Sequence, residues 1–174
     1  MSFSNIFYFQ IVPRRSRAEH LVPTIRRCSK QFRAALAVGD VRKMEESSKA
    51  AWDAMVNLFE ILRGEQDDGN LANGPMSVST AVIVNQVSAT EQQDMISAGK
   101  IDRVHASFGC LSLQDTLNKI AHYNISTATF RVDGRGSHYL LLGGKYQGKH
   151  WVAEILVSRL CKNAAAAVRA ITGP

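Results

Sequence analysis

The sequence predicts an α+β fold in which a mainly α-helical bundle is followed by a three-stranded antiparallel meander and a terminal helix. Apolar residues recur at helical spacing over most of the chain up to residue 124, and from about residue 126 they alternate with polar residues. With 174 residues, 45% of them hydrophobic, the chain can bury a core without disulfides or a metal. We expect a single domain over residues 1–174, made of an N-terminal arm or strand (1–19), the helical bundle (20–124), the meander (126–156) and the terminal helix (157–172).

Two helices open the expected bundle, at about 21–38 and 40–63. Pro23 fits a helix only within its first turn, which places the start of the first helix near Leu21. Asp40 is suited to cap the second helix, and Gly64 to end it.

The second helix carries an apolar seam with spacings of three and four residues. The seam can pack inside the chain's own core, which is the favoured interpretation, or pair with a second copy and form a homodimer. Its members are Val41, Met44, Ser48, Ala51, Met55, Leu58 and Leu62.

The middle of the chain is expected to hold a loop, a segment whose pattern fits helix or strand, two short helices and a connection between them. These are, in chain order, the loop 65–75, the unsettled segment 76–89, a helix from Thr90 with a capping-box residue at Gln93, the connection 99–111, and a helix over 113–123 opened by Ser112.

The meander is expected to have strands at 127–132, 138–142 and 150–156. Glycine-rich turns separate them, and turns of this composition between alternating segments are typical of antiparallel hairpins. A helix over 158–171 then packs against the rest.

Positive charge is concentrated in the first 43 residues, which carry a net +7, whereas the remainder carries −1. Such a surface favours an anionic partner, either a nucleic acid such as RNA or an acidic protein face, although a solvated helix face has the same composition. The residues proposed to contact the partner are Arg14, Arg15, Arg17, Arg26, Arg27, Lys30 and Arg33.

Cysteine and histidine usage argues against a metal or a cofactor. Cys28, Cys110 and Cys161 are odd in number and far apart, which fits buried thiols in a reducing cytoplasm, and no cysteine or histidine spacing is that of a zinc site. No stretch approaches the roughly 18 apolar residues that span a bilayer. The apolar N-terminal segment does not look like a signal peptide, because its charges follow the apolar run. We expect a cytoplasmic protein that does not associate with membranes.

One short motif carries candidate chemistry: Asn118 and His122 are four residues apart and share a helix face. Here the sequence resembles the HEPN superfamily of helical-bundle proteins, which includes metal-independent endoribonucleases of toxin–antitoxin and abortive-infection systems. The resemblance implies that His122 moves a proton while a 2′-hydroxyl attacks, with Asn118 as its polar partner. It also implies RNA binding and a homodimer.

The chain departs from the family motif at Leu117, where an arginine would hold the scissile phosphate. Leucine cannot replace that contact, so Arg103 or an N-terminal arginine would have to take its place, or the site is inactive. In the alternative interpretation His122 is a structural residue near a helix end.

Two functions therefore follow from the sequence. The first is an RNA-directed HEPN-like protein of a bacterial or phage conflict system, acting as a metal-independent endoribonuclease or as its degenerate form. The second is a non-enzymatic inhibitor or antitoxin-like protein, which would bind a protein partner through its basic helix or an exposed strand edge.

Overall fold

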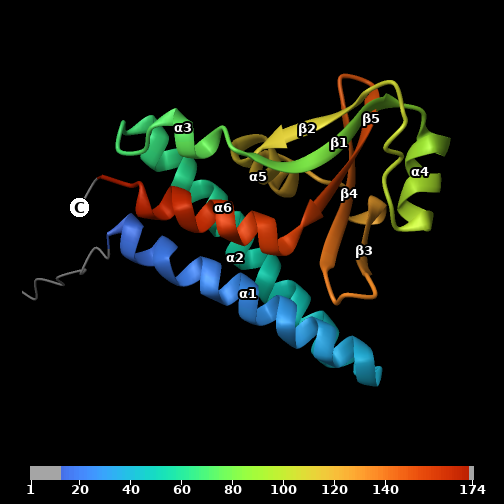
Figure 1. The fold of residues 1–174 in the computed structure, drawn as a ribbon, viewed down its shortest axis with the longest axis horizontal. Coiled ribbons are helices and arrows are strands. Elements are labelled where there is room, and N and C mark those ends of the chain that lie inside the picture. The colour runs from blue at the N-terminus through green and yellow to red at the C-terminus, as the bar shows by residue number, and fades with distance from the viewer. Residues whose placement is uncertain (1–12, 173–174) are drawn as a thin grey trace, which may run out of the picture.

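The computed structural model describes residues 13–172, in which helices cover both faces of an antiparallel sheet (Figure 1). The expected arm at residues 1–12 lies outside the described residues. The elements are α1 (Arg14–Val38), α2 (Val41–Asp67), α3 (Asn73–Met76), β1 (Ser79–Val87), α4 (Ala89–Ala98), β2 (Phe108–Ser112), α5 (Leu113–Ala121), a short 3-10 helix (Ile125–Thr127), β3 (Ala128–Val132), β4 (His138–Tyr146), β5 (Lys149–Leu156) and α6 (Val157–Arg169).

The long hairpin of α1 and α2 has the expected turn but different outer ends. Asp40 caps α2 by accepting a hydrogen bond from the backbone N–H of Lys43 at 3.1 Å, as predicted. Helix α1 begins at Arg14, so residues 14–19 are helical and Pro23 lies inside the helix instead of in its first turn. Helix α2 passes through Gly64 and ends at Asp67, so the predicted stop is wrong.

The mixed α+β class is confirmed, but the sheet has five strands in the order β2-β1-β5-β4-β3. Strands β3, β4 and β5 are the three predicted ones and pair as consecutive antiparallel hairpins. The segment 76–89, whose sequence fits helix or strand, contains strand β1. Strand β2 occupies part of the predicted connection 99–111. Both add to the free side of β5, so the meander is only part of the sheet.

Successive side chains of β5 pack in two different hydrophobic cores. Trp151, Ala153 and Ile155 face the larger core with the long helices. Val152, between them, packs in a smaller core that includes residues of α4. The sheet therefore lies between two apolar layers, because successive side chains of a strand point to opposite faces.

The helices on the larger core form a ring beside the sheet. Helices α5 and α6 pack on the strands, α1 packs against α2 and α6, and α2 packs against α5. Helix α4 covers part of the opposite face. The predicted bundle at 20–124 is therefore interrupted by β1 and β2, and its helices α1, α2 and α5 pack together, whereas α4 lies on the other face of the sheet.

Local capping differs from expectation at one helix. Helix α4 is capped by Ser88, not Thr90, and its capping box pairs Ser88 with Glu91. Helix α5 starts as predicted, since Ser112 accepts from the N–H of Asp115.

Candidate nucleic-acid interface

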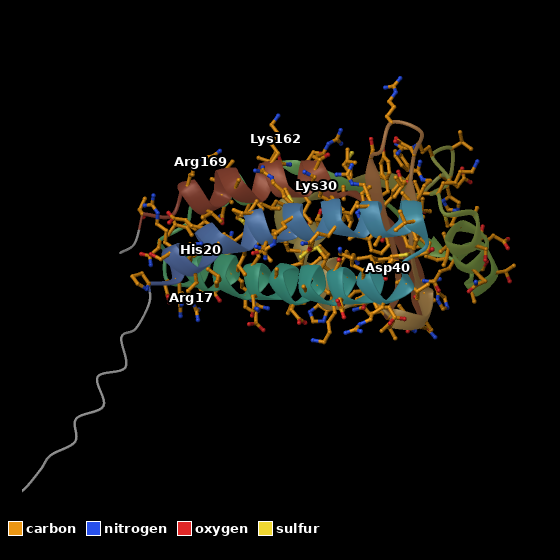
Figure 2. All side chains as sticks on the ribbon, turned by 90° about the horizontal axis from the view of Figure 1, so that it is seen from below. Arg17, His20, Lys30, Asp40, Lys162 and Arg169 are labelled. Carbon is orange, nitrogen blue, oxygen red and sulfur yellow. The ribbon has the colours of Figure 1, made fainter. Side chains whose placement is uncertain are left out.

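Helices α1 and α6 lie side by side and antiparallel on one side of the helical layer (Figure 2). At one end, Nη1 of Arg15 donates to the carbonyl oxygen of Ile171 at 3.2 Å, just beyond α6. Further along α1, Arg26 lies beside Cys161 of α6. Burial raises the pKa of the Cys161 thiol to about 11, and Arg26 opposes that shift. The two helices therefore present one continuous surface.

This pair of helices holds most of the protein's positive charge. Helix α1 has seven basic residues and one acidic residue, Glu19, and α6 has three basic residues and no acidic one. The pair carries +9, whereas the chain as a whole has 21 basic and 15 acidic residues, so the remainder carries −3. The excess of charge is thus confined to this surface.

Three of the basic side chains of α1 are held by intramolecular contacts. Arg14 pairs with Asp68 and with Glu65 of α2. Arg15 pairs with Glu19 at 3.2 Å. Arg33 donates from Nη1 to the carbonyl oxygen of Gly136 at 2.6 Å, which ties α1 to the β3–β4 turn.

The other seven basic side chains of the pair are exposed, and within residues 13–172 none lies within 4.0 Å of a carboxylate. We call them the cationic face. They are Arg17, Arg26, Arg27, Lys30, Arg159, Lys162 and Arg169. Figure 2 shows Lys30 of α1 beside α6, which carries Lys162 and Arg169, while Arg17 lies toward the α2 side of α1.

Sequence reasoning found part of this surface and missed the rest. It proposed seven basic residues, three in the expected N-terminal arm and four on the first helix; all seven are on α1, but Arg14, Arg15 and Arg33 serve internal contacts. It missed the basic residues of α6, because they are more than 120 residues away from those of α1. The sequence did indicate that the terminal helix is basic, because the predicted helix contains no acidic residue.

Asn118 lies on the side of α5 that faces α2, and His122 is the C-cap of this helix, which ends at Ala121 and not at residue 123 as predicted. Both are exposed, and the ring of His122 meets the ring of Phe59 edge-on, with centroids 6.4 Å apart. Asn118 lines a cleft of about 460 Å³ together with Phe59 and Arg63. This cleft is on the α2–α5 side of the ring of helices, away from the cationic face.

The surroundings of the motif explain its missing arginine. Leu117 is fully buried in the larger core, where an arginine would leave a charge out of water. Arg103, suggested as a replacement, instead pairs with buried Glu154 at 2.6 Å on the other face of the sheet. The guanidinium that shares the cleft with Asn118 is that of Arg63, which sequence reasoning did not select.

The described part of the chain contains no group of three or more metal-ligating side chains. None of its helices is both long enough and apolar enough to cross a bilayer. Cys28 and Cys161 are buried as expected, but Cys110 is exposed on β2.

Comparison of the chain with models of protein families, with curated proteins and with solved structures finds no match.

Proposed function

We propose that the protein binds RNA through the cationic face, mainly by contacts to backbone phosphates. The observation that carries the proposal is the concentration of seven exposed, unpaired basic side chains on two neighbouring helices that have a single acidic residue between them. Arginine and lysine that are not neutralised by carboxylates are available to replace the counterions of a polyanion.

The dimensions of the face suit several phosphates at once. From Arg159 to Arg169, α6 rises about 15 Å, since each helical residue adds about 1.5 Å. Arg26 and Lys30 of α1 lie alongside, whereas Arg17 is on the α2 side of α1. Contacts of this kind position a nucleic acid without reading its bases, so we expect weak sequence preference.

The choice of RNA over DNA rests on the resemblance carried by Asn118 and His122, not on the cationic face itself. Ribonuclease activity and a place in a conflict system stay predictions. Binding and cleavage are separable here, because the cationic face and the α2–α5 cleft lie on different sides of the helices.

The test is fluorescence anisotropy with a labelled RNA of about 30 nucleotides, and the same sequence as DNA, at KCl concentrations from about 50 to 200 mM. If the face neutralises about four phosphates of a single strand, the slope of log K against log[salt] is about −3, a loss of about 50-fold over that range.

Charge reversal supplies the matched variants. Lys30→Glu with Lys162→Glu changes one cation on each helix and should weaken binding at least about tenfold and flatten the salt slope by about 1.4. Lys145→Glu with Lys149→Glu makes the same change of net charge on the exposed β4–β5 hairpin. Equal weakening by both pairs would refute a localised site.

The result would also decide the second function predicted from sequence. RNA affinity that is negligible even at low salt would contradict the proposal and leave the face for an acidic protein partner. A stoichiometric complex with such a partner should survive salt that abolishes RNA binding, because protein interfaces add apolar burial to their charge contacts.

A further inference from the structure

A cavity of about 300 Å³ lies between the helical hairpin and the β3–β4 strands. Its walls come from α1 and α2 on one side and from β3, β4 and the chain after α5 on the other. The size is at the lower end of that of small-molecule sites, which are typically apolar with a few polar groups.

The wall of the cavity is aromatic and has no ionic side chain. Phe32 stacks on His138 with ring centroids 5.0 Å apart and meets Phe130 edge-on. Trp52 and Tyr123 form a second pair, with centroids 4.3 Å apart. No arginine, lysine, aspartate or glutamate lines it, and the nearby guanidinium of Arg33 is held by the carbonyl oxygen of Gly136, so a charged ligand would lose its hydration without a counter-ion in the wall.

His138 supplies a polar group that still lacks a partner. Its Nδ1 is 2.9 Å from Oγ of Ser29. Its Nε2 has no hydrogen-bond partner, and no other buried side-chain nitrogen or oxygen of the described residues lacks one. Buried polar atoms in native proteins are nearly always satisfied, so this one calls for an explanation.

The ring is uncharged near neutral pH. Burial, together with the nearby Arg33 guanidinium, lowers the pKa of His138 from 6.5 to about 4. A neutral imidazole has one donor and one acceptor nitrogen, and a ligand hydroxyl can pair with either.

We propose that this cavity binds an uncharged aromatic or aliphatic small molecule that carries one hydroxyl-like group, which hydrogen-bonds to Nε2 of His138. The proposal does not depend on RNA binding, since the cavity excludes the anions that the cationic face attracts. Apolar cavities of this kind take up apolar ligands because the ligand regains dispersion contacts and leaves water.

The test uses three ligands with the same naphthalene ring, titrated into the full chain by isothermal titration calorimetry at neutral pH. 1-Naphthol should bind one to one with a Kd on the order of 10 μM. 1-Methylnaphthalene, which lacks the hydroxyl, should bind about fivefold more weakly, and 1-naphthoate, an anion, at least about tenfold more weakly.

Two variants tie the binding to the cavity. Ser48→Trp on the exposed rim of α2 should abolish binding by filling the space, whereas Ser97→Trp on α4, across the sheet, should leave it unchanged. His138→Phe keeps the stacking on Phe32 but removes Nε2, so 1-naphthol and 1-methylnaphthalene should then bind equally.

Failure of 1-naphthol to bind saturably would overturn the proposal, as would equal weakening by Ser48→Trp and Ser97→Trp. A preference for 1-naphthol over 1-methylnaphthalene that persists in His138→Phe would overturn the role given to Nε2. Tighter binding of 1-naphthoate than of 1-naphthol would overturn the ligand class.

Discussion

Acidification from pH 7 to pH 5 should destabilise the folded protein through His138. In the fold, burial and the nearby Arg33 lower the pKa of this ring to about 4, whereas its ordinary value is 6.5. Between these two values the unfolded chain binds a proton that the folded chain does not. The contribution to stability is therefore complete above about pH 6.5 and is lost as the pH falls toward 4.

The size of the effect follows from the two pKa values. For a ring that is fully shielded from solvent, linkage gives a loss of about 2 kcal/mol between pH 7 and pH 5. His138 is only half-buried, and solvent screening reduces its interactions, so we expect a loss of about 1 kcal/mol from this residue.

Urea unfolding of the wild type and of His138→Phe at both pH values measures this contribution, because other titrating groups cancel in the comparison. His122→Phe makes the same substitution at an exposed site and should keep the wild-type pH dependence. If the free energy of unfolding of His138→Phe falls with pH as steeply as that of the wild type, the environment assigned to His138 is wrong.

Three further predictions concern the sheet and the helical motif. Gly144→Ala should lower the free energy of unfolding by about 3 kcal/mol, because its Cβ would collide with the buried ring of Trp151, whereas Gly109→Ala, whose Cβ meets nothing within 4 Å, should change it little. Glu154→Gln should cost about 1.5 kcal/mol in urea unfolding, because charge-assisted hydrogen bonds from two arginines are weakened while both arginines stay partly exposed to water. His122→Ala should leave RNA affinity unchanged in the anisotropy assay, since His122 is not on the cationic face. The same variant should abolish any cleavage of labelled RNA in metal-free buffer, and cleavage that persists would contradict the predicted role of His122.

The helical hairpin and the last three strands could be predicted because each depends on a local pattern. Asp40 caps its own helix, and the glycine-containing turns after β3 and after β4 separate the last three strands in the sequence. Strand β1 was harder, because Ala81 and Ile83 pack in one core and Val84 in the other. A strand buried on both faces has no clear alternation and resembles a buried helix in sequence.

The ends of the helices depended on contacts between distant residues. The interpretation of Gly64 as a stop fails because α2 continues to Glu65 and Asp67, where it meets the start of α1 through Arg14. The start of α1 was missed because residues 14–20 contain no large apolar side chain to show periodicity. In both cases tertiary packing extended a helix that local signals would end.

The candidate sites were less predictable than the fold. The cationic face requires α6 to lie beside α1, and its helices are more than 100 residues apart. His138 gave no signal as a strand residue, because its environment is set by Ser29 and Phe32 on a distant helix. The motif at Asn118 was found because its two residues are close in sequence, with His122 as the C-cap of the helix that carries Asn118.

Helix α1 contributes to both proposed sites from different sides, and this separates the two by charge. Phe32 and Ser29 face the apolar cavity, while Lys30, between them in sequence, is exposed on the cationic face. Neighbouring residues of a helix point in different directions, so Lys30 can face water while Ser29 faces the cavity. A lysine that faced the cavity would lose its hydration without an ionic partner. We therefore expect anionic ligands to bind on one side of α1 and uncharged ligands on the other. The charge of a ligand therefore indicates which of the two sites it occupies. Lys30→Glu should impair the cationic face and leave the cavity intact, whereas Ser48→Trp should impair the cavity and leave the cationic face intact.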